Sequence, residues 1–162
     1  QWLDHKYLGY NYRMDEMSAA VGLAQIEKID FLIKKRREIA GWYAQELKKT
    51  DSLIEIPYTP PEATHTWFVY VIRIKNERIN RNKVIQDLAK RGVSSKPYLP
   101  SIHLFSFYTD RFGYKKGDFP ISEKISDSVL ALPFYIGLTR QDIKTIVKKL
   151  GSTLKKYERI QK

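Results

Sequence analysis

The chain has 162 residues, of which 43% are hydrophobic and 29% are charged. This apolar content can fill a core, which excludes an intrinsically disordered protein, and no apolar run approaches the roughly 18 residues that a membrane-spanning helix needs. The absence of cysteine excludes disulfides and thiolate metal sites. Because the three histidines do not lie at metal-ligand spacing either, we expect no metal site.

The formal net charge of +11 is concentrated near the C-terminus, where residues 140–162 hold eight basic and two acidic side chains. Such a charge makes nucleic acid or another acidic ligand a candidate partner. A solvated face of the last helix explains the same residues, and we favour it. A small basic nucleic-acid-binding domain is kept as an alternative, although we find no basic face interleaved with aromatic residues.

The first third of the chain predicts an irregular segment followed by a long helix. Residues 1–13 are aromatic and irregular, and apolar side chains recur at helical spacing over residues 15–48. An unbroken helix of this length would run about 50 Å, at about 1.5 Å per residue. We therefore expect either a bend or break near Asp30, or a helix that bridges two domains.

The middle of the chain predicts a linker, a strand and a helix. The prolines of residues 57–61 interrupt regular structure. Residues 66–75 read as a strand with apolar groups on both faces, so we expect it to be central in its sheet, with Trp67 and Phe68 in the core. Residues 81–91 predict a helix that ends at Gly92.

The last part of the chain predicts one more strand and several helices. We expect a strand over residues 93–98, a helical turn over 103–108 and a polar loop over 112–118. A helix over 121–131 should end before Pro133, and Thr139 should cap the last helix. Together these elements predict an α+β unit preceded by a long helical arm.

Several motifs occur in one order that resembles a known family. Glycine-rich phosphate loops and the Gly-x-Ser-x-Gly elbow are absent. The chain instead resembles the DegT/StrS-type nucleotide-sugar aminotransferases, and among them it is similar to perosamine-synthase-like members. The segments that carry the resemblance include Leu8-Gly9-Tyr10-Asn11-Tyr12-Arg13-Met14-Asp15-Glu16, Gly22-Leu23-Ala24-Gln25, Arg36-Arg37-Glu38-Ile39-Ala40, His65-Thr66-Trp67-Phe68, Tyr98-Leu99-Pro100-Ser101-Ile102-His103-Leu104, Phe112-Gly113-Tyr114 and Leu132-Pro133-Phe134-Tyr135-Ile136-Gly137-Leu138-Thr139.

This resemblance implies the small C-terminal domain of a fold-type I pyridoxal-phosphate (PLP) transferase. Residues 1–50 would form an interface loop and a long, bent connecting helix, and residues 51–162 the small α+β domain. The family's active site lies at a homodimer interface, where Asn11 would bind the cofactor phosphate and Arg13 the phosphate or the substrate. An amide and a guanidinium suit these tasks. From the residues alone, a helix-entry loop in which Asn11 and Arg13 make local contacts is the favoured explanation.

The resemblance also implies substrate-binding roles for Tyr98 and His103. Some relatives carry a histidine where this chain has Pro97, so their substrate contacts cannot be copied directly. A locally satisfied tyrosine hydroxyl and a histidine that caps a turn remain open as structural alternatives. His65 is expected to be structural.

We expect no catalytic residue in this chain, because no segment resembles the family's Schiff-base lysine motif. A PLP transaminase needs that lysine to hold the cofactor and to move the proton. The resemblance implies a cytoplasmic parent enzyme of polysaccharide biosynthesis that transfers an amino group from an amino acid, expected to be glutamate, to a nucleotide-linked keto-sugar. The start at Gln1 suits an internal cut, so the chain is expected to be a fragment that is inactive alone. A stand-alone, degenerate dimerisation module is a further alternative.

Overall fold

The computed structural model describes Tyr10 and residues 12–50 and 52–160, which belong to two units, Gln1–Leu32 and Ile33–Lys162. The main element of the first unit is helix α1 (Glu16–Ile26). Its N-cap is Asp15, whose carboxylate accepts hydrogen bonds from the backbone N–H (2.8 Å) and the hydroxyl (2.6 Å) of Ser18. These bonds lower the pKa of Asp15. α1 buries none of its residues and leaves large apolar side chains exposed, namely Met17, Val21, Leu23 and Ile26.

Helix α2 (Ile29–Leu47) follows after a turn at Glu27 and Lys28. The interruption expected near Asp30 is therefore confirmed, two to three residues earlier in the chain. The C-terminal half of α2 turns one apolar stripe towards the core, made of Ile39, Ala40, Tyr43 and Leu47. A short 3₁₀ turn, η1 (Lys48–Thr50), ends the helical segment.

The second unit is built on a four-stranded antiparallel sheet in the order β1-β2-β4-β3. The strands are β1 (Ile54–Glu55), β2 (Tyr70–Ile74), β4 (Val129–Leu132) and β3 (Lys96–Pro97). Tyr70 pairs with Leu132 and Ile72 with Leu130, so these side chains share one face of the sheet. They are buried, and they alternate with the half-buried Val71 on the other face.

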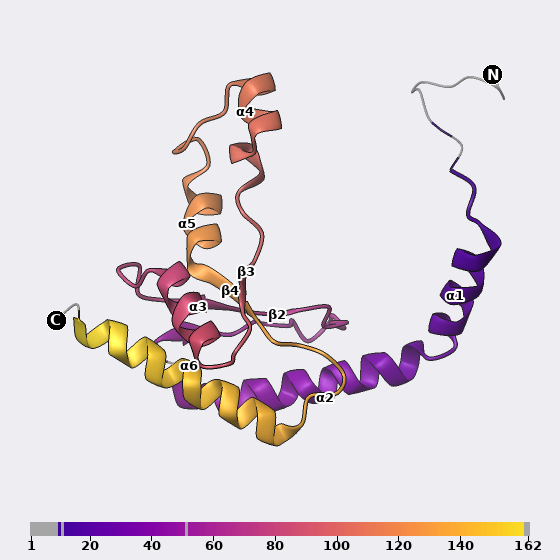
Figure 1. Ribbon diagram of the computed structural model, residues 1–162, viewed down its shortest axis with the longest axis horizontal. Helices are drawn as coiled ribbons and strands as arrows, with labels where there is room; N and C mark the ends of the chain where they lie inside the picture. The colour runs from indigo at the N-terminus through magenta and orange to yellow at the C-terminus, as the bar shows by residue number, and fades with distance from the viewer. Residues whose placement is uncertain (1–9, 11, 51, 161–162) are drawn as a thin grey trace. The chain divides into compact units, whose positions relative to one another are not determined.

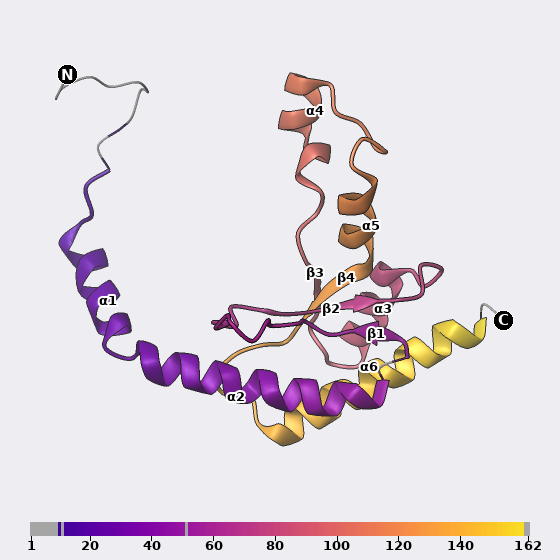
Figure 2. The ribbon, with the colours of Figure 1, turned by 180° about the vertical axis from the view of Figure 1, so that it is seen from behind.

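Three helices close the core over the face that carries Tyr70, Ile72 and Leu130. They are the C-terminal half of α2, α3 (Arg81–Lys90) and α6 (Arg140–Ile160). Figures 1 and 2 show α2 and α6 on one side of the sheet, while α4 (Ser106–Phe112) and α5 (Pro120–Ser128) rise from the other side. α3 and α6 contribute fully buried aliphatic side chains to this core: Val84, Leu88, Ile143, Leu150 and Leu154.

An aromatic cluster ties α2 to the sheet. The hydroxyl of Tyr43 donates a 2.7 Å hydrogen bond to the carbonyl oxygen of Pro133, and its ring stacks on Tyr70 at a centroid distance of 4.8 Å. Burial raises the pKa of both phenols, because the phenolate would lose its hydration. Trp67 and Phe134 extend the cluster at its edge.

The expected helix over 121–131 is wrong in its last turn. α5 ends at Ser128, and residues 129–132 form β4, which pairs with β2 on one side and β3 on the other. Leu130 and Leu132 alternate with less buried residues, as strand geometry requires. A four-residue apolar run cannot be assigned from periodicity alone, and here pairing with distant strands decides its conformation.

The expected strand over 66–75 is central in its sheet, as predicted, but it begins only at Tyr70. Trp67 has a φ of 54°, a left-handed conformation that interrupts an extended chain. The expectation that Phe68 is a core residue is wrong, since its side chain is 77% exposed. Trp67 is half-buried against the core, and the ring nitrogen Nδ1 of His65 accepts a 2.8 Å hydrogen bond from the Trp67 backbone N–H. This contact confirms the structural role expected for His65.

The remaining helices agree with the pattern of the sequence more closely than the remaining strand does. α3 spans all but one residue of the helix expected over 81–91, and Gly92 follows it with a φ of 75°. Thr139 and Asp142 bond each other at the start of α6, as a helix cap. The strand expected over 93–98 is reduced to β3, and the expected helical turn becomes η2 (Ile102–Leu104) followed by α4.

Candidate functional site

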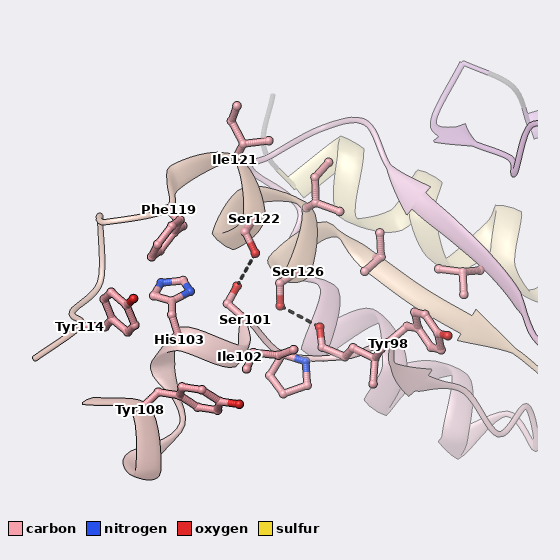
Figure 3. A pocket seen from close by; sticks show the side chains of 15 residues that line it. Tyr98, Ser101, Ile102, His103, Tyr108, Tyr114, Phe119, Ile121, Ser122 and Ser126 are labelled. Carbon is pink, nitrogen blue, oxygen red and sulfur yellow. Dashed lines mark hydrogen bonds between the residues drawn. The ribbon is translucent and has the colours of Figure 1, made fainter. Parts of the chain in front are cut away.

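A pocket within the described residues, here named the apolar pocket, has a volume of about 770 Å³. It opens on the sheet face opposite the core, where Val71 and Val129 reach it from β2 and β4. Figure 3 shows its walls, formed by the segment after β3, the loop before α5, and α5 itself. The other lining residues are Tyr98, Leu99, Pro100, Ser101, Ile102, His103, Tyr108, Tyr114, Phe119, Ile121, Ser122, Ile125 and Ser126.

The segment from Tyr98 to His103 is shaped by its backbone and by α5. Leu99 has a φ of 49°, a left-handed conformation that costs a non-glycine residue conformational energy. The hydroxyl of Ser126 donates a 3.1 Å hydrogen bond to the Leu99 carbonyl oxygen, and the hydroxyls of Ser122 and Ser101 lie 3.5 Å apart (Figure 3). α5 thus holds one wall of the pocket in place.

His103 is buried and paired with Glu123. Its Nε2 lies 3.0 Å from Oε1 of Glu123, and both side chains are about nine-tenths buried. Glu123 also accepts hydrogen bonds from the backbone N–H groups of Gly117 (2.8 Å) and Phe119 (3.4 Å). The Gly117 bond above all, together with that from His103, lowers the pKa of the Glu123 carboxyl. An ionised carboxylate only accepts, so Nε2 of His103 donates.

The pairing fixes the orientation of the His103 ring. Phe119 packs on the ring at a centroid distance of 4.8 Å, and Tyr114 meets it edge-on at 6.5 Å. With Nε2 committed to Glu123, Nδ1 is the remaining polar atom, and it has no hydrogen-bond partner within the described part of the chain. The ring therefore presents a fixed edge at one end of the pocket (Figure 3).

Tyr98 lies at the other end of the pocket and is half-buried. Its hydroxyl has no hydrogen-bond partner among the described residues. The structure thus brings Tyr98 and His103, both selected from the sequence, to one pocket. Its aromatic walls and few hydroxyl groups can bind a ring-bearing polar molecule, and no lysine lines it.

The two residues expected to bind the cofactor belong to the first unit. Arg13 is exposed, with no ion pair to any residue that the structure describes. Asn11 lies outside the described residues. The described chain also holds no cluster of side chains suited to a metal ion, and none of its helices is long and apolar enough to cross a membrane.

Sequence reasoning missed Glu123 and the three serines of the pocket. Glu123 lies twenty residues after His103 and contacts it only because α5 folds back over the 98–103 segment. Acidic residues are common in the first turn of a helix, because they interact favourably with the helix dipole. The position of Glu123 in the first turn of α5 therefore gave no indication of a functional role. Tyr114 belonged to a recognised motif, but no pattern placed it beside His103.

Comparison with known proteins connects this geometry to a family. A family model described as the DegT/DnrJ/EryC1/StrS aminotransferase family matches residues 1–151. An uncharacterised protein of Methanocaldococcus jannaschii is 36% identical over 141 residues, covering 86% of this chain and 36% of that protein. GDP-perosamine synthase of Caulobacter vibrioides is 31% identical over 148 residues, covering 91% of this chain and 39% of the synthase.

A solved structure from Bacillus cereus, assigned as a PLP-dependent aminotransferase, matches with a TM-score of 0.77 and 28% identity over 90% of this chain and 39% of that one. The chain therefore spans less than two fifths of the length of each of these three relatives. The fold is that of an aminotransferase segment, mixed helix and antiparallel sheet, as the sequence predicted. The chain belongs to the DegT/DnrJ/EryC1/StrS aminotransferase family.

Proposed function

We propose that the chain is the C-terminal part of a PLP-dependent aminotransferase that moves an amino group from glutamate to a nucleotide-linked keto-sugar. The observation that carries the proposal is the apolar pocket, which gathers Tyr98 and His103 inside the part of the chain that matches the family model. The relative that makes GDP-perosamine, an amino sugar on a nucleotide, supports this substrate class.

The pocket suits part of such a substrate. About 770 Å³ falls within the roughly 300–1,000 Å³ typical of small-molecule sites. Aromatic walls can cover the apolar face of a sugar ring or a base, while the Tyr98 hydroxyl and His103 Nδ1 supply a donor and an acceptor for hydroxyl groups. Glu123 then acts as the positioning residue that holds His103 in one tautomer.

The residues present are suited to bind only the phosphate group of the cofactor. Arg13, exposed and without an ion-pair partner among the described residues, can bind a phosphate, and Asn11 can donate to it without adding charge. The apolar pocket offers no lysine to hold the cofactor covalently. When bound to such a lysine, PLP supplies the electron sink for amino transfer. We further propose that the parent enzyme is homodimeric and cytoplasmic, that its sites are shared between subunits, and that the chain is inactive alone.

The substrate role of Tyr98 is tested in the full-length protein. Tyr98→Phe removes one hydroxyl, and loss of a substrate hydrogen bond of about 0.5–1.5 kcal/mol should lower kcat/KM for the keto-sugar about 2- to 13-fold. Tyr135→Phe is the matched control, because Tyr135 is exposed and lies outside the pocket lining. Equal kcat/KM values for the two variants would remove Tyr98 from the substrate site.

The cofactor role is tested by cofactor retention. Asn11→Ala and Arg13→Ala should release PLP faster during dialysis than the wild-type protein, read from the absorbance of the bound cofactor. Arg37→Ala is the control for lost positive charge, since Arg37 is an exposed residue of α2 without an ion pair within the described residues. Retention equal to that of the control would contradict a phosphate contact.

A further inference from the structure

A second hollow in the fold lies between α6 and the C-terminal end of α3. It has a volume of about 480 Å³ and is here named the basic groove. It shares no lining residue with the apolar pocket. Every side chain that lines it is either cationic or neutral and polar: Arg91, Gln141, Lys144, Thr145, Lys148, Lys149 and Ser152.

Two of its cations are held in place by a reciprocal contact. Nη1 of Arg91 donates to the Lys149 carbonyl oxygen (2.9 Å) and to the hydroxyls of Ser152 (2.8 Å) and Thr153 (2.7 Å). Nζ of Lys149 donates to the Arg91 carbonyl oxygen at 2.6 Å. Each side chain thus bonds the other residue's backbone. All these acceptors are neutral, so the two positive charges are fixed near each other and are not neutralised.

Two more cations project from the same face of α6. Lys144 and Lys148 lie one turn apart, at the spacing that places side chains next to each other on a helix. Both are exposed, and neither has an ion pair or side-chain hydrogen bond within the residues that the structure describes. Two turns further along, Lys156 is paired with Asp87 at 2.7 Å. Lys156, outside the groove, is therefore neutralised by a carboxylate, whereas Lys144 and Lys148 within the groove are not.

We propose that the basic groove binds a small anion with neighbouring phosphate groups, of the di- or triphosphate class. Four cations without a lining carboxylate attract several negative charges, and the fixed guanidinium of Arg91 keeps its other N–H groups for an oxyanion. The Gln141 amide adds a neutral donor. No aromatic or aliphatic residue lines the groove, so it offers phosphate contacts but no wall on which a base could stack.

The test is a calorimetric titration of the full-length protein with inorganic pyrophosphate at fixed ionic strength. Lys144→Gln/Lys148→Gln removes two exposed charges of the groove, while Lys34→Gln/Lys155→Gln removes two exposed lysines elsewhere and gives the same net charge. We expect the dissociation constant to rise about tenfold or more in the groove variant, as the loss of charge-assisted hydrogen bonds predicts, and less than about twofold in the control.

Three results would overturn the proposal. Equal weakening in both variants would mean that pyrophosphate responds to net charge alone. Binding of monophosphate as tight as that of pyrophosphate would mean that neighbouring phosphates are not recognised. Absence of pyrophosphate binding, with salt-dependent binding of a DNA duplex, would make the groove a nucleic-acid surface. Transaminase activity of the groove variant, measured in parallel, reports separately on the proposed function.

Discussion

Replacing Tyr43 by phenylalanine removes a single hydroxyl from the centre of the core. That hydroxyl donates the 2.7 Å hydrogen bond to the carbonyl oxygen of Pro133, and the side chain is fully buried. Phenylalanine keeps the ring and its stacking on Tyr70. The change therefore isolates one hydrogen bond, which joins α2 to the segment that follows β4.

The expected cost follows from the carbonyl that is left behind. A buried acceptor that loses its donor destabilises the folded state by about 1–3 kcal/mol. Since 1.4 kcal/mol is a factor of ten, the opened state of this region should become about 5- to 150-fold more populated. α2 and the strands paired with β2 share the effect, because the hydrogen bond connects them.

Hydrogen exchange of backbone amides in α2 and β2 of the full-length protein measures this opening directly. Tyr135→Phe is the control: the Tyr135 side chain is exposed, so exchange should change by about twofold or less, within about 0.5 kcal/mol. Indistinguishable exchange in Tyr43→Phe and in the control would refute the reasoning that this hydroxyl holds α2 to the sheet.

Two further predictions concern pH. Burial raises the pKa values of the Tyr43 and Tyr70 phenols above 10.0. Their contribution to folding stability is therefore complete below pH 10 and falls as pH rises further, because the phenols of the unfolded chain ionise first. The midpoint temperature of thermal unfolding, measured between pH 8 and about 11, should decline, and it should decline less steeply in Tyr43→Phe. The lowered pKa of Glu123 has the opposite consequence: its stabilisation is present above pH 4.5 and is lost as pH falls further. The protection of amides near Gly117, taken relative to their intrinsic exchange rates, should therefore fall in acid, and in Glu123→Gln it should already be low at neutral pH.

Local patterns predicted the helices better than the strands. α6 and α3 follow their apolar periodicity because each buries one stripe against the sheet. β4 was mistaken for helix because a short apolar run acquires its conformation from pairing with β2 and β3, whose residues are distant in sequence.

The candidate site was predictable in part. Tyr98 and His103 emerged from the resemblance of their segment to a family, and the structure places both in one pocket. The pair between His103 and Glu123 was not predictable, because it depends on how α5 folds back after a loop whose path no local pattern determines. The prediction that Phe68 is a core residue was wrong for a related reason. The left-handed backbone of Trp67 changes which side chain of the segment points towards the core.

The pairing of β3 with β4 has a consequence for how the pocket can change. Pro97 lies opposite Leu130, so residues 98–128 leave the sheet and return to it at adjacent points. Within this excursion lie all the residues that line the apolar pocket except Val71 and Val129. Closing a loop between fixed ends costs little more when the loop is lengthened. This part of the chain can therefore be exchanged between relatives, or replaced by design, as a cassette that alters ligand preference while the sheet and its helices keep their packing.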